Sequence, residues 1–294
     1  MGVLPTSVQL AVEVGIGLAV CQLLLTALCA SPVGGRARRQ PAFVAHQLIT
    51  LPLMVYVASI GSIGWFFPSP EDAALAATVE GRLYGVNSVG ERISATVLGA
   101  MVFWDIPCTC LPSIYSVAGM GHHVGLAVLS AIALLPYTQH YAPFFVGVIE
   151  ISSIPLVVVD VFHPKHFADV ANSSPSLRGL NEAMRIAFAL CFVLLRTIAF
   201  PIVIVWGALP DFGSQVRFGD DADTSRTVLA IVAIGFALGF TALQLHWSYL
   251  LLKQVVKGLR GGADDDSRRD VKGPAGDYRL YDEDEEARQS MAPL

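Results

Sequence analysis

The chain has 294 residues, of which 54% are apolar and 15% are charged, and its formal net charge is −5. An ordinary soluble domain has roughly 25% charged residues, so this chain has too little polar material to coat a globule. The composition excludes a typical soluble protein, and the acidic balance gives no sign of nucleic-acid binding.

Seven apolar segments are about twenty residues long, which at 1.5 Å per residue is enough to cross the hydrocarbon core of a bilayer. We therefore predict an all-α, polytopic membrane protein with about seven transmembrane helices. The fourth segment is the shortest. In chain order the predicted spans are 8–30, 43–66, 93–116, 119–136, 141–162, 183–208 and 227–252.

Basic and acidic residues alternate between the connections that join these spans. The first and fifth connections are basic, whereas the second and sixth are acidic, which is the pattern of the positive-inside rule. We therefore expect a lumenal or extracellular N-terminus and a cytosolic C-terminus. The endoplasmic reticulum is the expected membrane, with the plasma membrane and Golgi as alternatives. The residues concerned are Arg36, Arg38, Arg39, Lys165 and Arg178 against Glu71, Asp72, Glu80, Asp211, Asp220, Asp221 and Asp223.

The C-terminal segment 257–294 is highly charged and has few aliphatic residues. It holds seven of the nineteen Lys and Arg residues and ten of the twenty-four Asp and Glu residues. Such a segment cannot bury enough apolar surface to fold alone, so we predict a disordered cytosolic tail. The tail either keeps the protein soluble on that side or binds a protein partner, with Ser267 and Ser290 as candidate phosphorylation sites.

Six polar side chains lie within five of the predicted spans. A charge at the bilayer centre costs about 2.5–3.5 kcal/mol on insertion, so these side chains are expected to face the interior of the helix bundle. Each charged one lies near a proline, which frees the carbonyl four residues earlier. We therefore predict an interior polar cavity that opens toward the cytosol. The six residues are His46, Asp105, His122, His123, Glu150 and Arg196, and the prolines are Pro107, Pro155 and Pro201.

Individual roles follow from charge and helix geometry. Arg196 is predicted to be the counter-ion of Glu150 or Asp105. His122 and His123 point about 100° apart, so they can flank one cavity but cannot aim at one atom. His46 lies near one end of its predicted span, so it is either an interfacial residue or a functional one. Compact metal-ligand spacing such as His-Glu-x-x-His is not present in the sequence, so we predict neither a metal nor a bound cofactor.

The order of these motifs on successive helices resembles the TLC-domain family, which includes ceramide synthases and translocating-chain-associating membrane proteins. The resemblance rests on Trp104-Asp105, on Gly121-His122-His123, on the stretch 150–155 (Glu-Ile-Ser-Ser-Ile-Pro) and on 195–201 (Leu-Arg-Thr-Ile-Ala-Phe-Pro). It implies an N-terminal helix in 1–35, a six-helix domain in 36–256 and the tail 257–294.

The resemblance also bears on activity. His46 is similar to the family's histidine in the first core helix, and ceramide synthases carry further aspartates after the double histidine. Here the stretch 148–155 contains no aspartate. The chain is therefore more similar to the small non-synthase members, which are associated with membrane lipid composition.

Two interpretations of function follow. In the first, the protein binds a lipid or acyl chain in its cavity, with His46 and Arg196 as binding residues, and takes part in lipid homeostasis. In the second it is an acyltransferase that uses cytosolic acyl-CoA as co-substrate. A trafficking or translocation factor and a transporter are further alternatives, and a homo-oligomer is compatible with each. The catalytic candidates are His122 or His123 as general base or acyl acceptor, oriented by Glu150 or Asp105.

Overall fold

The structure is a computed structural model that describes residues 5–163, 165–217 and 223–269, and every element in these ranges is helical. This confirms the predicted all-α class. The α-helices are α1 (Thr6–Ala30), α2 (Pro41–Phe66), α3 (Pro70–Ala76), α4 (Val79–Tyr84), α5 (Ser88–Ala100), α6 (Ile106–Thr109), α7 (Val117–Ala133), α8 (Ser153–Val161), α9 (Ala168–Ala171), α10 (Pro175–Cys191), α11 (Phe200–Val203), α12 (Leu209–Gln215) and α13 (Thr224–Arg269).

Seven apolar helical segments correspond to the seven predicted spans. Five are long and apolar enough to cross a membrane, namely α1, α2, Pro143–Val161, Pro175–Gln215 and Thr224–Val256. The other two are the continuous helical segment 88–109, which is not among these five, and the shorter α7, which was predicted to be the shortest span. The chain is therefore a multi-pass membrane protein by length and composition of its helices.

The third segment ends earlier than the sequence predicted. It was expected to reach residue 116, but α6 ends at Thr109 and a turn follows. Pro112 lacks the amide hydrogen that a continuing helix needs, and Ser116 then starts α7 by accepting a hydrogen bond from the amide of Gly119.

Three helical segments leave regular α geometry near their buried charges. Residues Met101–Asp105 and Phe192–Ala199 form π-helical turns, and Pro143–Gly147, also π-helical, leads into a tighter 3₁₀ segment, Val148–Ser152. These segments contain Asp105, Arg196 and Glu150, and a proline follows each of them. The irregular backbone therefore coincides with the intramembrane charges, as the positions of the prolines indicated.

Glycines allow two pairs of helices to approach backbone to backbone. A Cβ atom on Gly61 of α2 would lie 2.4 Å from the Cα of Gly147, and one on Gly99 of α5 would lie 2.0 Å from the carbonyl oxygen of Ala11 in α1. Such contacts replace side-chain volume with close helix packing, which drives association in a bilayer. The N-terminal helix α1 consequently packs directly against α2 and α5 within the compact unit that ends at Ser248.

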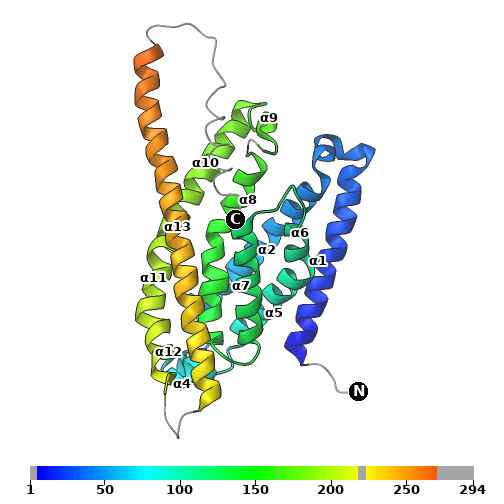
Figure 1. Ribbon diagram of the computed structural model, residues 1–294. Helices are drawn as coiled ribbons and strands as arrows, with labels where there is room; N and C mark the ends of the chain where they lie inside the picture. The colour runs from blue at the N-terminus through cyan, green and yellow to red at the C-terminus, as the bar shows by residue number, and fades with distance from the viewer. Residues whose placement is uncertain (1–4, 164, 218–222, 270–294) are drawn as a thin grey trace. The chain divides into compact units, whose positions relative to one another are not determined.

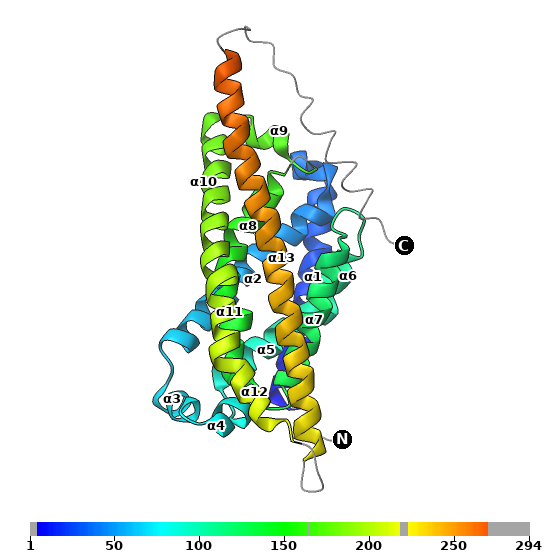
Figure 2. The ribbon, with the colours of Figure 1, turned by 60° about the vertical axis from the view of Figure 1, so that its left-hand side comes forward.

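The connections are tied together in pairs at opposite ends of this unit. Arg39 binds Asp169 at 2.9 Å, which joins the first and fifth connections near α9. At the other end Arg82 of α4 binds Asp211 of α12 at 2.6 Å. Figures 1 and 2 show α9 at one end and α4 with α12 at the other. The first and fifth connections therefore lie at one end of the unit, and the second and sixth lie at the other.

These two ion pairs differ in their surroundings. The hydrogen bond from Arg39 lowers the pKa of Asp169, but both side chains are about half exposed, so the pair adds little stability. Asp211 is buried, and its hydrogen bond with Arg82 raises the pKa of that guanidinium above its usual value. The pair at the α4–α12 end is therefore the stronger structural link.

The C-terminal segment differs in part from the prediction. The second compact unit begins at Tyr249, and the α13 backbone stays helical to Arg269, whereas a disordered tail was predicted from residue 257. No proline occurs between Thr224 and Arg269, and Gly261-Gly262 weakens a helix by only about 1 kcal/mol per glycine. The predicted tail from residue 270 onward, with Ser290, lies outside the described residues, as do Asp220 and Asp221.

The orientation in the membrane is open to a glycosylation test. Asn172 begins an Asn-Ser-Ser acceptor beside the Arg39–Asp169 pair, at the end predicted to be cytosolic. We expect Asn172 to stay unmodified and an acceptor engineered between Glu71 and Glu80 to be glycosylated, as a gel shift sensitive to glycosidase. Glycan on native Asn172 would reverse the assigned orientation.

Candidate functional site

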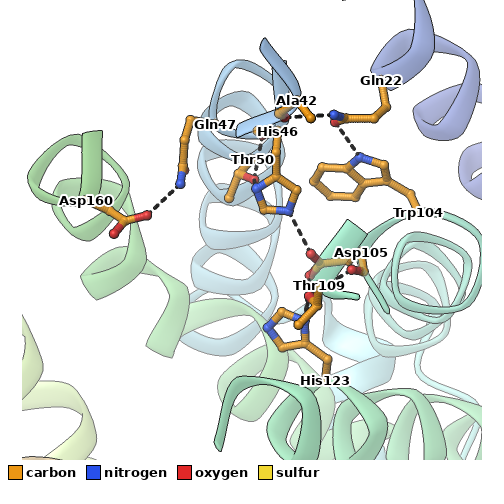
Figure 3. Close-up of polar contacts among 10 residues, drawn as sticks. All are labelled: Gln22, Ala42, His46, Gln47, Thr50, Trp104, Asp105, Thr109, His123 and Asp160. Atoms are coloured by element: carbon orange, nitrogen blue, oxygen red, sulfur yellow. Dashed lines mark hydrogen bonds and ion pairs between the residues drawn. The ribbon is translucent and has the colours of Figure 1, made fainter. Parts of the chain in front are cut away.

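Asp105 lies between two histidines from two other helices (Figure 3). His46 Nε2 of α2 is 2.9 Å from Asp105 Oδ1, and His123 Nδ1 of α7 is 3.2 Å from Asp105 Oδ2. Asp105 and His46 are buried, whereas the His123 side chain is 23% exposed. Each oxygen of the carboxylate therefore has its own imidazole partner, which satisfies a charge that would be costly in this environment.

A second set of contacts fixes the His46 ring. The ring stacks on Trp104 with a centroid distance of 4.9 Å, and Thr50 lies 3.3 Å from its Nδ1. Trp104 Nε1 in turn donates to Gln22 Oε1 of α1 at 3.1 Å, and Gln22 donates to the carbonyl of Ala42 at 3.0 Å. The N-terminal helix thus supports the site through a neutral amide, as Figure 3 shows.

The π-helical turn Met101–Asp105 explains how neighbouring residues both reach the interior. A π turn contains more residues than an α turn, so consecutive side chains diverge less around the helix. Trp104 and Asp105 are 2% and 7% exposed, and Thr109 donates to the Asp105 carbonyl at 2.9 Å. The deformation therefore brings the acid and its supporting indole to the same side of the bundle.

Glu150 and Arg196 form a separate cluster. Arg196 Nη2 lies 3.2 Å from Glu150 Oε1 and 3.0 Å from Ser153 Oγ, and its Nε donates to Ser152 Oγ at 2.7 Å. Both charged side chains are buried. The predicted ion pair is confirmed with Glu150 as the partner, and Asp105 is not the counter-ion.

The six polar residues do not share one cavity, which corrects the sequence prediction. His123 binds Asp105, whereas His122 turns toward α13, where its ring packs edge-on against Phe240 and Trp247 at 5.5 Å each. The two histidines are successive residues of one helix, so their side chains diverge. His122 Nδ1 is buried and has no hydrogen-bond partner among the described residues.

His122 is also the one of the six that faces the main cavities found in the described part of the chain. It lines a partly open cavity of about 80 Å³ and a more open groove of about 490 Å³ between α7 and α13. The cavity wall is otherwise mostly aromatic and aliphatic. The arrangement therefore separates the paired charges from a largely apolar space.

The geometry offers no metal centre in the described ranges, where no group of three His, Cys, Asp or Glu side chains could hold an ion. The imidazoles of His46 and His123 contact different oxygens of one carboxylate, so their nitrogens do not converge. What the Asp105 cluster can do chemically is hold the His123 ring in one tautomer, with Nε2 directed away from the carboxylate.

Sequence reasoning missed several supporting residues. Gln22 is a neutral residue in an apolar helix, and Ser152 and Ser153 sit in a motif noted only for its glutamate and proline. Arg82 was not singled out either, although it and the Tyr141 hydroxyl both bind Asp211. For Gln22, Ser152 and Ser153 the signal in the sequence was the presence of hydrogen-bonding groups inside apolar segments.

The fold and the site together define a multi-pass α-helical membrane protein whose bundle holds a buried aspartate between two histidines. A family model for the TLC domain matches residues 74–253, which is more than half of the chain, and the chain belongs to the TLC-domain family. The match includes Asp105, Glu150 and Arg196 but begins after His46, whereas a domain from residue 36 was predicted. No curated protein and no solved structure matches the chain.

The Arg196–Glu150 pair generates a stability prediction. Replacing Arg196 by Leu leaves Glu150 as an unpaired buried charge, so we expect a loss of roughly 3–5 kcal/mol, measured as a fall in thermal stability in detergent. Adding Glu150→Gln removes that charge and should recover part of the loss, as a double-mutant cycle reports.

The matched control is Arg185→Leu on α10, because Arg185 is 60% exposed and its pair with Glu182 is a surface one. This variant should unfold at the wild-type temperature. A double variant no more stable than Arg196→Leu alone would contradict the inferred charge pairing.

Proposed function

We propose that the protein binds an acyl chain in the cavity beside His122 and acts through this binding in membrane lipid homeostasis. The observation that carries the proposal is a partly open, aromatic-lined cavity beside one buried imidazole nitrogen, His122 Nδ1, that has no partner among the described residues. A mostly apolar space with a few polar groups is typical of a site for a hydrophobic ligand.

The groove between α7 and α13 offers a route to this cavity. The two spaces share His122, Phe236 and Phe240, so they adjoin at the histidine. A Cβ atom added to Gly121, or to Gly235 on α13, would meet nothing within 4 Å, so glycine keeps the groove open. A chain can pass from the groove to the cavity without crossing the paired charges.

Charge balance indicates which polar group such a lipid presents. The Asp105 carboxylate is occupied by His46 and His123, and Arg196 is occupied by Glu150. No charged residue of the described chain lines this cavity. A neutral ester, amide or carbonyl therefore suits the position beside His122 better than a charged headgroup, because a buried charge needs a counter-ion.

A second candidate function, acyl transfer from cytosolic acyl-CoA, is favoured by one contact. Asp105 holds Nδ1 of the partly exposed His123, which leaves Nε2 to remove a proton from an attacking amine or hydroxyl. The acyl carbon would bond to the amine nitrogen or the hydroxyl oxygen while the thioester C–S bond breaks, and CoA would leave as the thiol after taking the proton from His123 Nε2. Asp105, rather than Glu150, is the orienting acid in this scheme.

Filling the cavity tests lipid binding directly. Ala237 of α13 is buried on the cavity wall, so Ala237→Leu should reduce labelling by a photoreactive fatty ester roughly tenfold or more and remove copurified acyl lipid from mass spectra. Ala242→Leu, on the exposed side of the same helix, is the matched control and should label like wild type. Equal labelling of Ala237→Leu and wild type would contradict the proposed site.

The two histidines distinguish binding from catalysis. If the protein only binds lipid, His123→Gln should keep both ester labelling and the lipid profile of cells that lack the native protein. If it transfers acyl groups, His123→Gln should lose transfer of label from acyl-CoA by roughly 10²-fold or more while still binding the ester. Wild type that transfers no label from acyl-CoA to any amine or hydroxyl lipid would exclude the second candidate.

A further inference from the structure

Two pairs of glycines line the groove between α7 and α13. They are Gly121 and Gly125 on α7 and Gly235 and Gly239 on α13, so the members of each pair lie four residues apart. Residues four apart share one face of a helix, and glycines with this spacing usually let two membrane helices meet backbone to backbone. Here a Cβ atom added to Gly121, Gly235 or Gly239 would meet nothing within 4 Å. These glycines therefore leave a groove open instead of bringing the two helices into contact.

The aromatic ring of Phe240 lies at the boundary between the groove and the cavity. Phe240, Phe236 and His122 line both spaces. The Phe240 ring lies edge-on to the His122 ring at a centroid distance of 5.5 Å, and it stacks on Phe236 at 6.4 Å. A Cβ atom on Gly125 would lie 2.8 Å from Cζ of Phe240, so the tip of the ring occupies the place of a side chain on α7. The ring thus spans the gap from α13 to α7 and stands between the two spaces.

Only apolar and aromatic contacts hold the Phe240 side chain in this position. The side chain is partly buried, and a phenyl ring has no hydrogen bond to lose when it changes rotamer. Moving His123, by contrast, would remove a partner from the buried carboxylate of Asp105. The open space beside Gly235 and Gly239 gives a ring in the groove room to move. Phe240 is therefore the element of this wall that can be displaced at the lowest cost.

We propose that the Phe240 ring is a gate through which an acyl chain passes from the bilayer, by way of the groove, into the cavity. This deepens the proposed function, on which it rests, by naming the source of the chain as a lipid already in the bilayer. The groove lies along apolar helices, and no Asp, Glu, Lys or Arg of the described chain lines it. A chain that takes this route stays in apolar surroundings throughout, so its transfer needs no exposure to water.

A gate controls the rate of exchange, so entry and exit of the ligand are measured separately. The full-length protein in phosphatidylcholine nanodiscs takes up the photoreactive fatty ester, or releases it to an excess of unreactive ester, and is illuminated after increasing delays. We expect Phe240→Ala to gain and to lose label at least tenfold faster than wild type, because a lower barrier speeds both directions. Phe145→Ala is the matched control, since Phe145 is also partly buried but lines the cavity alone, and it should not speed entry.

Filling the groove tests the route without altering the ring. In the double variant Gly235→Leu with Gly239→Leu both new side chains start in open space, so the helix bundle is not strained. We expect entry and exit to slow at least tenfold while the final labelling reaches the wild-type level. Gly17→Leu on α1 is the matched control, because Gly17 is exposed and also has nothing within 4 Å of an added Cβ atom. It should exchange at the wild-type rate.

The outcomes separate the gate from the proposed function. Wild type that takes up no ester would overturn both. Wild type that labels normally, with Phe240→Ala exchanging at the same rate, would overturn the gate while lipid binding stands. If Phe240→Ala is unstable, the groove variant decides, and exchange as fast as that of Gly17→Leu would show that the chain enters elsewhere and overturn the route.

Discussion

The neutralisation of Asp105 inside the membrane is the constraint on which the arrangement of the bundle depends. A lone carboxylate at this depth is unfavourable, and here its two oxygens are bound by imidazoles from α2 and α7. The three helices must therefore keep one mutual register. The indole of Trp104 extends the same register to α1 through Gln22, so four helices converge on one charge.

The polar residues of the bundle fall into two groups: charges that are paired with one another, and His122, which is not paired with a charge. The paired charges hold helices together. Asp105 links its own helix to α2 and α7, and the Arg196–Glu150 pair links the segments 143–161 and 175–215. His122 is left out of both clusters and faces the apolar cavity. The histidine that binds Asp105 and the histidine that lines the cavity are thus adjacent residues of one helix.

The sequence predicted those parts of the structure that follow from strong energetic penalties. Span lengths, the inward position of the charges and the Arg196–Glu150 pair all follow from the cost of exposing polar groups to lipid. Which of His122 and His123 binds Asp105 could not be predicted, because it depends on the rotation of α7 about its axis. Gln22, Ser152 and Ser153 were missed because neutral residues cost too little in a helix to attract notice.

The extent of the functional unit follows from the contacts rather than from the family match. The matched range 74–253 contains the acid and one of its imidazoles, but His46 and Gln22 precede it. Without α2 one oxygen of Asp105 would lose its partner, and without α1 the indole beside His46 would lose its acceptor. Removing one partner leaves an uncompensated buried charge, which destabilises a protein more than replacing both partners by apolar residues. The residues from α1 onward must therefore fold together for the site to exist.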